Sequence, residues 1–144
     1  MYSALDIARY VIWYCNERGY VVSNLKLQKI LYFIQAQFLV FNENHEPCFR
    51  DRIEAWTFGP VVPEVYRQYR LYGNAHIPSL DNEEDFELIA ENDSEMIDEV
   101  VNECAEYTAS QLVELTHHQS PWIDAFRNGR NTPITNEAIR SFFE

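Results

Sequence analysis

Two adjacent histidines and three cysteines are the side chains of this sequence best suited to metal binding or nucleophilic catalysis. His117 and His118 are neighbours, so on a helix they point about 100° apart and do not form a same-face ligand pair. No HExxH or CxxC spacing accompanies them. Cys48 with a histidine is a conceivable nucleophile pair, but nothing in its local sequence marks it as activated. These patterns predict no metal, no cofactor and no catalytic residue.

The charge of the chain is strongly negative and unevenly placed. It has 23 acidic residues against 11 Lys and Arg, a formal net charge of -12, and no Lys or Arg lies between Arg70 and Arg127. Such a surface repels phosphate backbones and anionic membranes, so neither nucleic acid nor a membrane is an expected partner. A basic protein is the more natural partner, whereas the alternative is a solvated face that keeps the chain soluble. The acidic candidates for partner docking are Glu91, Glu95, Asp98, Glu99, Glu103 and Glu106.

Cysteine usage and hydropathy suggest where the protein works. Cys15, Cys48 and Cys104 are odd in number and widely spaced, and no basic segment followed by an apolar run opens the sequence. The longest mostly apolar stretch, Ile30–Phe41, is too short to span a bilayer. We therefore expect a cytoplasmic protein with reduced thiols, and its 144 residues suit one domain over residues 1–144.

Helical periodicity dominates the elements that must position these residues. Ser3 is placed to cap a first helix that ends at Gly19, and Ser23 or Asn24 opens a second helix with apolar residues at three- and four-residue steps from Leu27 to Phe41. This second helix is the expected centre of the molecule. Further helices are predicted to begin at Ser94, at Thr108 or Ser110, and at Thr135, the last with Ala138, Ile139, Phe142 and Phe143 facing inward.

A Gly-Pro pair interrupts the helical pattern. Cys48–Phe49 and Ile53–Trp56 read as extended segments or a small hairpin, and Pro60 keeps Gly59 out of the helical region, so the chain is expected to turn there. Pro63 suits the first position of a helix that stops at Gly73. The predicted fold is mainly α: a single compact helical domain around a central hydrophobic helix, with at most a small β-hairpin.

Three segments in this order resemble the Panacea-domain family, which includes SocA-like antitoxins and phage-associated proteins. They are "LKLQKILYFIQ" from Leu25, "EAWTFGPVVPEVY" from Glu54 and "LTHHQSPW" from Leu115, and the resemblance covers nearly the whole chain. It implies an antitoxin that binds and neutralises a toxin encoded beside it. It also implies a further partner in some relatives, since at least one family member delivers its toxin to a bacterial protease.

The residues that match the family motifs have two competing roles. Most are what a core uses to dock the Gly-Pro segment onto the central helix, whereas Gln28, Lys29 and His117 are explained either by a buried hydrogen-bond network or by direct contact with the toxin. The candidates are Leu27, Gln28, Lys29 and Tyr32 on the central helix, Trp56, Gly59, Pro60, Val61 and Tyr66 in and around the Gly-Pro turn, and Thr116, His117, Pro121 and Trp122 in the third motif.

Several classes of function therefore compete. The favoured class is a non-enzymatic antitoxin that binds a cognate toxin. The alternative is a protease adaptor or phage-encoded regulator that binds a host protein, with a bacterial protease or chaperone as a further partner. A hydrolase that uses His117 is the third class, and a DNA-binding autoregulator, whose affinity would fall steeply with salt, is the fourth.

Overall fold

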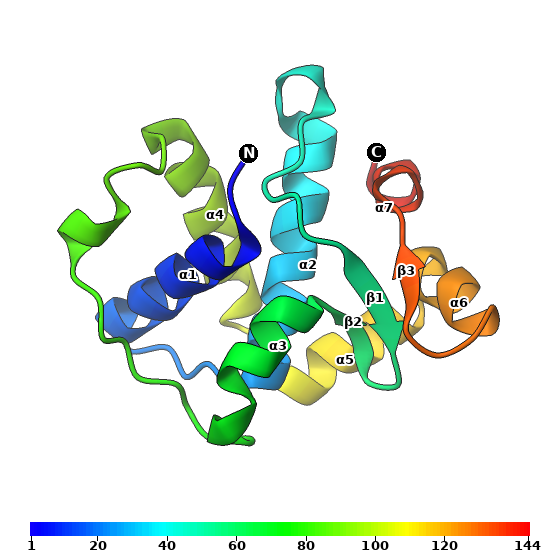
Figure 1. Cartoon of the computed structure of the whole chain (residues 1–144), viewed down its shortest axis with the longest axis horizontal. Coiled ribbons are helices and arrows are strands. Elements are labelled where there is room, and N and C mark those ends of the chain that lie inside the picture. The colour runs from blue at the N-terminus through cyan, green and yellow to red at the C-terminus, as the bar shows by residue number, and fades with distance from the viewer.

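Helix α2 (Asn24–Phe41) runs through the middle of the structure, a computed structural model that describes residues 1–144 (Figure 1). It contacts α1, α3, α4, α5, α7 and strand β2. Most of its residues are buried, as expected of a helix enclosed by others. The expectation of a mainly α fold around this hydrophobic helix is confirmed.

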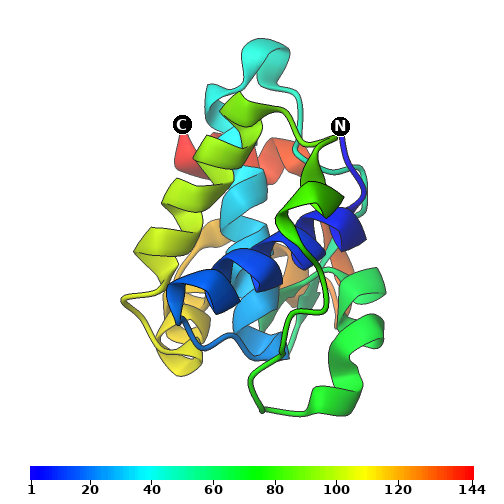
Figure 2. The same cartoon turned by 90° about the vertical axis from the view of Figure 1, so that its left-hand side faces the viewer.

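The other elements pack around α2 in two groups. Helices α1 and α4 cover one side, as Figure 2 shows with α2 behind them, and a small sheet with α5, α6 and α7 covers the other. In chain order the elements besides α2 are α1 (Ala4–Arg18), η1 (Glu43–His45), β1 (Ile53–Trp56), β2 (Gly59–Val61), α3 (Pro63–Tyr69), η2 (Arg70–Tyr72), η3 (Glu83–Phe86), α4 (Glu91–Cys104), α5 (Ala109–His117), α6 (Ser120–Arg127), β3 (Thr132–Ile134) and α7 (Asn136–Phe143).

Local capping explains where several helices begin. The hydroxyls of Ser3, Ser23, Thr108 and Thr135 each accept a hydrogen bond from the backbone N–H three residues on, which satisfies a donor that the first turn leaves free. The predicted start of α4 at Ser94 is wrong. This helix begins at Glu91, because the Tyr2 hydroxyl accepts a hydrogen bond from the N–H of Ala90 and fixes the chain there.

The sheet is larger than the hairpin that was expected. Its strand order is β2-β1-β3, with both pairings antiparallel, and β3 was not predicted. Cys48–Phe49 does not pair with β1; Phe49 instead forms a bridge with Tyr2. The chain turns at Thr57–Phe58, two residues earlier than predicted, so Gly59 and Pro60 lie in the returning strand.

Two aromatic residues that were expected to face inward are exposed. Phe41 at the end of α2 is 68% exposed and Phe142 in α7 is 42% exposed. Both lie in the last turn of their helix, where few neighbouring elements remain to cover them. The apolar periodicity is correct as a helix signal at these two positions but not as a sign of burial.

Gln35 fastens the segment before the sheet to α2. Its Oε1 accepts hydrogen bonds from the N–H groups of Cys48 and Phe49, and its Nε2 donates to the carbonyl oxygen of Phe49. Because all these groups are buried, no water replaces a missing partner. The side-chain amide of Gln35 therefore satisfies three backbone groups in a segment that lies outside the sheet.

We predict that Gln35→Leu lowers the free energy of unfolding by about 2–4 kcal/mol, since it leaves two buried N–H groups and one carbonyl without partners. Urea denaturation followed by circular dichroism measures the change. Gln37→Leu is the matched control, because Gln37 is half-buried on the same helix, and it should change stability by less than about 0.5 kcal/mol. Equal effects in both variants would contradict this role of Gln35.

Candidate functional site

The three sequence motifs meet where α2, the β1–β2 hairpin and the α5–α6 junction come together. Lys29, Gln28 and Tyr32 come from α2, Gly59 and Pro60 from β2, and the histidine-tryptophan motif from α5 and α6. We call this region the motif junction and define it by the following residues: Gln28, Lys29, Tyr32, Trp56, Gly59, Pro60, Thr116, His117, Gln119 and Trp122.

Lys29 is the most unusual residue of the motif junction. Its side chain is fully buried, and its Nζ donates a hydrogen bond to the carbonyl oxygen of Pro60 at 3.0 Å. No carboxylate forms a salt bridge with it, and burial lowers the pKa of the amine from 10.5 to about 7. The amine is therefore held close to the boundary between its charged and neutral forms at physiological pH.

Gly59 makes the close approach of β2 to α2 possible. Its φ is +106°, and a Cβ at this position would lie 2.7 Å from Lys29 Cε and 2.8 Å from Thr116 Oγ1. Only glycine combines that backbone conformation with that space. Thr116 is itself fully buried, and its hydroxyl donates to the carbonyl oxygen of Val113 within α5.

Gln28 continues the same contact toward the start of α3. Its Oε1 accepts a hydrogen bond from the N–H of Val62, the residue that caps α3, and its Nε2 donates to Asn24 Oδ1. Asn24 Nδ2 in turn donates to the carbonyl oxygen of Tyr66. The ring of Tyr66 packs edge-on against Trp56 with centroids 5.0 Å apart. Gln28 thus positions both the end of the hairpin at Val62 and the first turn of α3.

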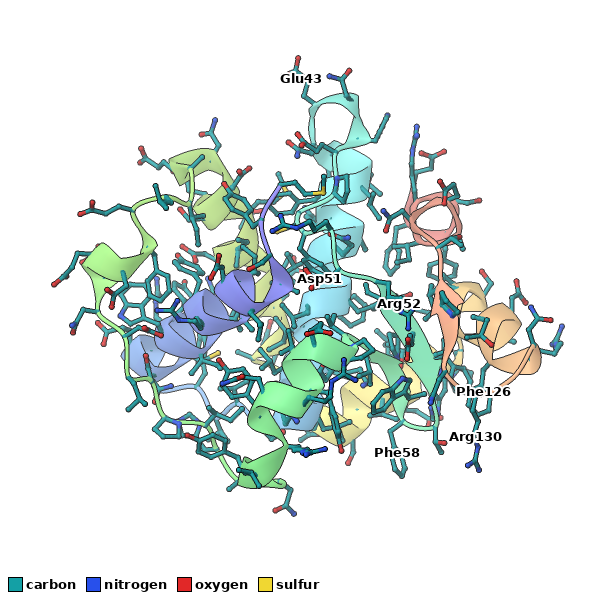
Figure 3. The ribbon with its side chains drawn as sticks, in the orientation of Figure 1. Glu43, Asp51, Arg52, Phe58, Phe126 and Arg130 are labelled. Carbon is teal, nitrogen blue, oxygen red and sulfur yellow. The ribbon has the colours of Figure 1, made fainter.

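The third motif holds the hairpin from the opposite side. Trp122 Nε1 donates to the carbonyl oxygen of Trp56 at 2.8 Å, and His117 Nε2 lies 3.0 Å from the carbonyl oxygen of Thr57. A carbonyl oxygen only accepts, so His117 Nε2 carries the proton in this contact. The His117 and Trp122 rings pack with centroids 4.2 Å apart. Phe58 at the tip of the hairpin stays exposed and lies at the outer end of the sheet (Figure 3).

The remaining motif residues fill the space between these contacts. Leu27 and Val61 are buried, and Pro121 is buried in the first turn of α6. The Tyr32 hydroxyl donates to Gln119 Oε1 at 2.8 Å, inside the protein. The motif residues are therefore brought together, and the polar side-chain atoms of Gln28, Lys29 and Tyr32 bond to backbone or to the buried Asn24 and Gln119.

The sequence analysis missed three buried polar residues: Asn24 and Gln119, which belong to this hydrogen-bonded system, and Gln35, which bonds Cys48 and Phe49. A signal existed for Gln35, since Gln28, Tyr32 and Gln35 recur at four- and three-residue steps along a mostly apolar helix. Polar residues at helical spacing in a buried helix must find partners. Asn24 and Gln119 stand at helix starts, where a polar residue is common and does not by itself indicate a buried partner.

The residues considered for catalysis and metal binding are not assembled into a reactive centre. The three cysteines are buried free thiols, and burial raises the pKa of Cys48, which disfavours the nucleophilic thiolate. His118 Nδ1 lies 2.9 Å from the carbonyl oxygen of Glu114, away from His117. No group of three potential metal ligands is gathered anywhere in the chain. No helix combines the length and the apolar character that crossing a membrane requires.

The acidic candidates, on α4 and in the turn that follows it, separate into two sets. Asp98 accepts a hydrogen bond from the Tyr10 hydroxyl at 2.6 Å and is partly buried against α1, as Asp93 does with Tyr2. These two carboxylates hold α4 to the rest of the protein. The other candidates, Glu91, Glu95, Glu99, Glu103 and Glu106, are exposed.

Comparison with known proteins agrees with this arrangement. The family model described as "Antitoxin SocA-like, Panacea domain" matches residues 27–123, a range that contains all the candidate motif residues from Leu27 to Trp122. Antitoxin SocA of Caulobacter vibrioides (strain NA1000 / CB15N) is 36% identical over 123 residues, which covers 78% of this chain. The alignment spans 64% of that relative's own length. No solved structure matches the chain. This protein belongs to the Panacea-domain family of SocA-like proteins.

We predict that Gly59→Ala lowers the free energy of unfolding by about 2–4 kcal/mol, because it adds both a positive-φ penalty and a clash with Lys29 and Thr116. Gly19→Ala is the control: its φ is +73°, but nothing lies within 4 Å of an added Cβ. It should cost only about 1 kcal/mol. Thermal and urea denaturation compare the two variants, and a Gly59→Ala loss no greater than that of Gly19→Ala would rule out the clash.

Lys29 also predicts a specific pH dependence. Its folded pKa of about 7 lies below its ordinary 10.5, so between these values the unfolded chain binds one more proton and stability rises with pH. Relative to Lys29→Met, the wild-type protein should gain about 1.4 kcal/mol per pH unit from pH 7.5 to 9. The comparison with Lys29→Met is necessary because burial also raises the pKa values of Cys15 and Cys104 from 9.0 to about 12. Those two shifts lower stability as pH rises, in opposition to the effect of Lys29. Parallel stability curves for the two proteins would contradict the assignment.

Proposed function

We propose that this protein is an antitoxin that binds and neutralises a toxin encoded beside it, acting in the cytoplasm and without catalytic activity of its own. The observation that carries the proposal is its 36% identity over 123 residues to Antitoxin SocA. The antitoxin activity of that relative is transferred to this chain as a proposal, since the aligned region is shorter than the relative itself.

The geometry supports a binding role over an enzymatic one. The polar motif residues that packing alone does not explain, Lys29, Gln28 and His117, each have a backbone carbonyl or N–H as partner. They thereby shape a scaffold, and the surface outside it is left to recognise a partner. We propose that the exposed glutamates of α4 take part in that recognition, because a surface of net charge -12 favours a basic partner.

The decisive experiment uses the reading frame next to this one. Induction of that gene alone should arrest growth, and co-expression of this protein should restore colony counts by about 100-fold or more. A frameshifted copy of this gene controls for the burden of expression. If the neighbouring gene is harmless when expressed alone, the antitoxin proposal loses its basis.

The same system separates simple neutralisation from delivery to a protease. With direct neutralisation, the toxin level stays constant and a stable complex can be purified. With an adaptor, the toxin level falls in a host that has its ATP-dependent proteases and not in strains that lack them. Immunoblotting of the toxin after translation is stopped measures the difference.

A further inference from the structure

An apolar groove lies on the side of α2 that the sheet does not cover. It has a volume of about 320 Å³ and is lined by residues of α2, α4, α5 and α7 together with Tyr107 and Gln119. Three of its aromatic or aliphatic side chains are well exposed: Phe41 by 68%, Tyr107 by 46% and Leu115 by 45%. Apolar side chains clustered in this way, with a polar border, are typical of a surface that binds another protein.

The border of the groove is acidic. Glu103 lines it, Glu99 lies one helical turn earlier on the same face of α4, and Glu106 lies in the turn after α4, next to Tyr107 of the groove. All three are exposed. On the other side, Glu114 of α5 lies in an adjoining hollow that shares Tyr107 and Leu115 with the groove. No Lys or Arg lines either hollow.

These features select one kind of occupant. The elements that form the groove walls are helices, and no strand edge lies along it, so an incoming segment cannot add a strand and must pack side chains instead. An apolar floor with carboxylates along the border fits an amphipathic helix that has basic residues beside its apolar face. A second copy of this chain would bring acidic borders together, and like charges at an interface oppose association.

We propose that this groove, between α2, α4, α5 and α7, is where the partner's basic amphipathic helix docks. The inference rests on the proposed antitoxin function and adds to it the surface and the chemical class of the partner segment. Asp93 and Asp98 accept hydrogen bonds from the Tyr2 and Tyr10 hydroxyls, whereas Glu99 and Glu103 are exposed and available to a partner.

The test compares groove variants with matched variants elsewhere on the surface. Leu115→Asp should weaken binding of the co-encoded protein by about 30-fold or more, as expected for a central apolar contact. Leu88→Asp is its control, because Leu88 is a leucine that is 95% exposed and lies outside the groove. Glu103→Lys with Glu106→Lys should weaken binding by about tenfold or more. Its control is Glu83→Lys with Glu84→Lys, which changes the net charge equally in η3.

Affinities are measured by calorimetry, with circular dichroism to show that each variant is folded. Wild-type affinity in the groove variants, or equal losses of affinity in groove and control variants, would contradict docking in the groove. If the co-encoded protein does not bind the wild-type chain at all, the antitoxin proposal fails separately.

A designed helix then tests the groove without any toxin. An amphipathic peptide of about 18 leucine and lysine residues should bind the wild-type chain and the two control variants. Its affinity should fall by about tenfold or more for Leu115→Asp. The same peptide with glutamate in place of lysine should bind at least about tenfold more weakly. Peptide binding that is indifferent to Leu115→Asp would overturn the proposal.

Discussion

The close approach of β2 to α2 is the constraint on which the rest of the structure depends. Gly59 gives the backbone room beside Lys29 and Thr116, so the Lys29 amine reaches the Pro60 carbonyl and Gln28 reaches the N–H of Val62. Once these contacts form, the hairpin and the start of α3 have fixed positions against the central helix. Trp122 and His117 then close the arrangement from the opposite side by bonding to the hairpin carbonyls.

The contact made by Lys29 has a high free-energy cost, because a buried amine loses its solvation and this one has a single hydrogen-bond partner, the Pro60 carbonyl. A long side chain that ends in a donor does, however, reach a strand carbonyl across the depth of the core. Its lowered pKa lets it remain neutral inside the protein near physiological pH. A polar contact of this kind fixes one arrangement of hairpin and helix, whereas apolar packing alone tolerates several.

The sequence predicts the local features of this fold better than the distant ones. The caps at Ser3, Ser23 and Thr135 follow from residues within one turn, and they are found as expected. The start of α4 depends on Tyr2, 88 residues away, and β3 depends on pairing with β1. No local pattern encodes such contacts. For the motif junction, the family resemblance identified the residues, but only the structure shows that Asn24 and Gln119 complete the hydrogen bonds of Gln28 and Tyr32.

Helix α4 shows how one acidic segment serves two purposes. Because Asp93 and Asp98 attach α4 to tyrosine hydroxyls, the exposed glutamates of this helix have fixed backbone positions. Fixed charges beside an apolar floor lose less conformational entropy on binding than charges on a mobile segment. Gln119 is the one residue of the motif junction that also lines the groove, whereas Lys29, Gly59 and Pro60 do not. Substitutions along the groove border can therefore change partner preference while the contacts at Gly59, which hold the fold together, stay the same.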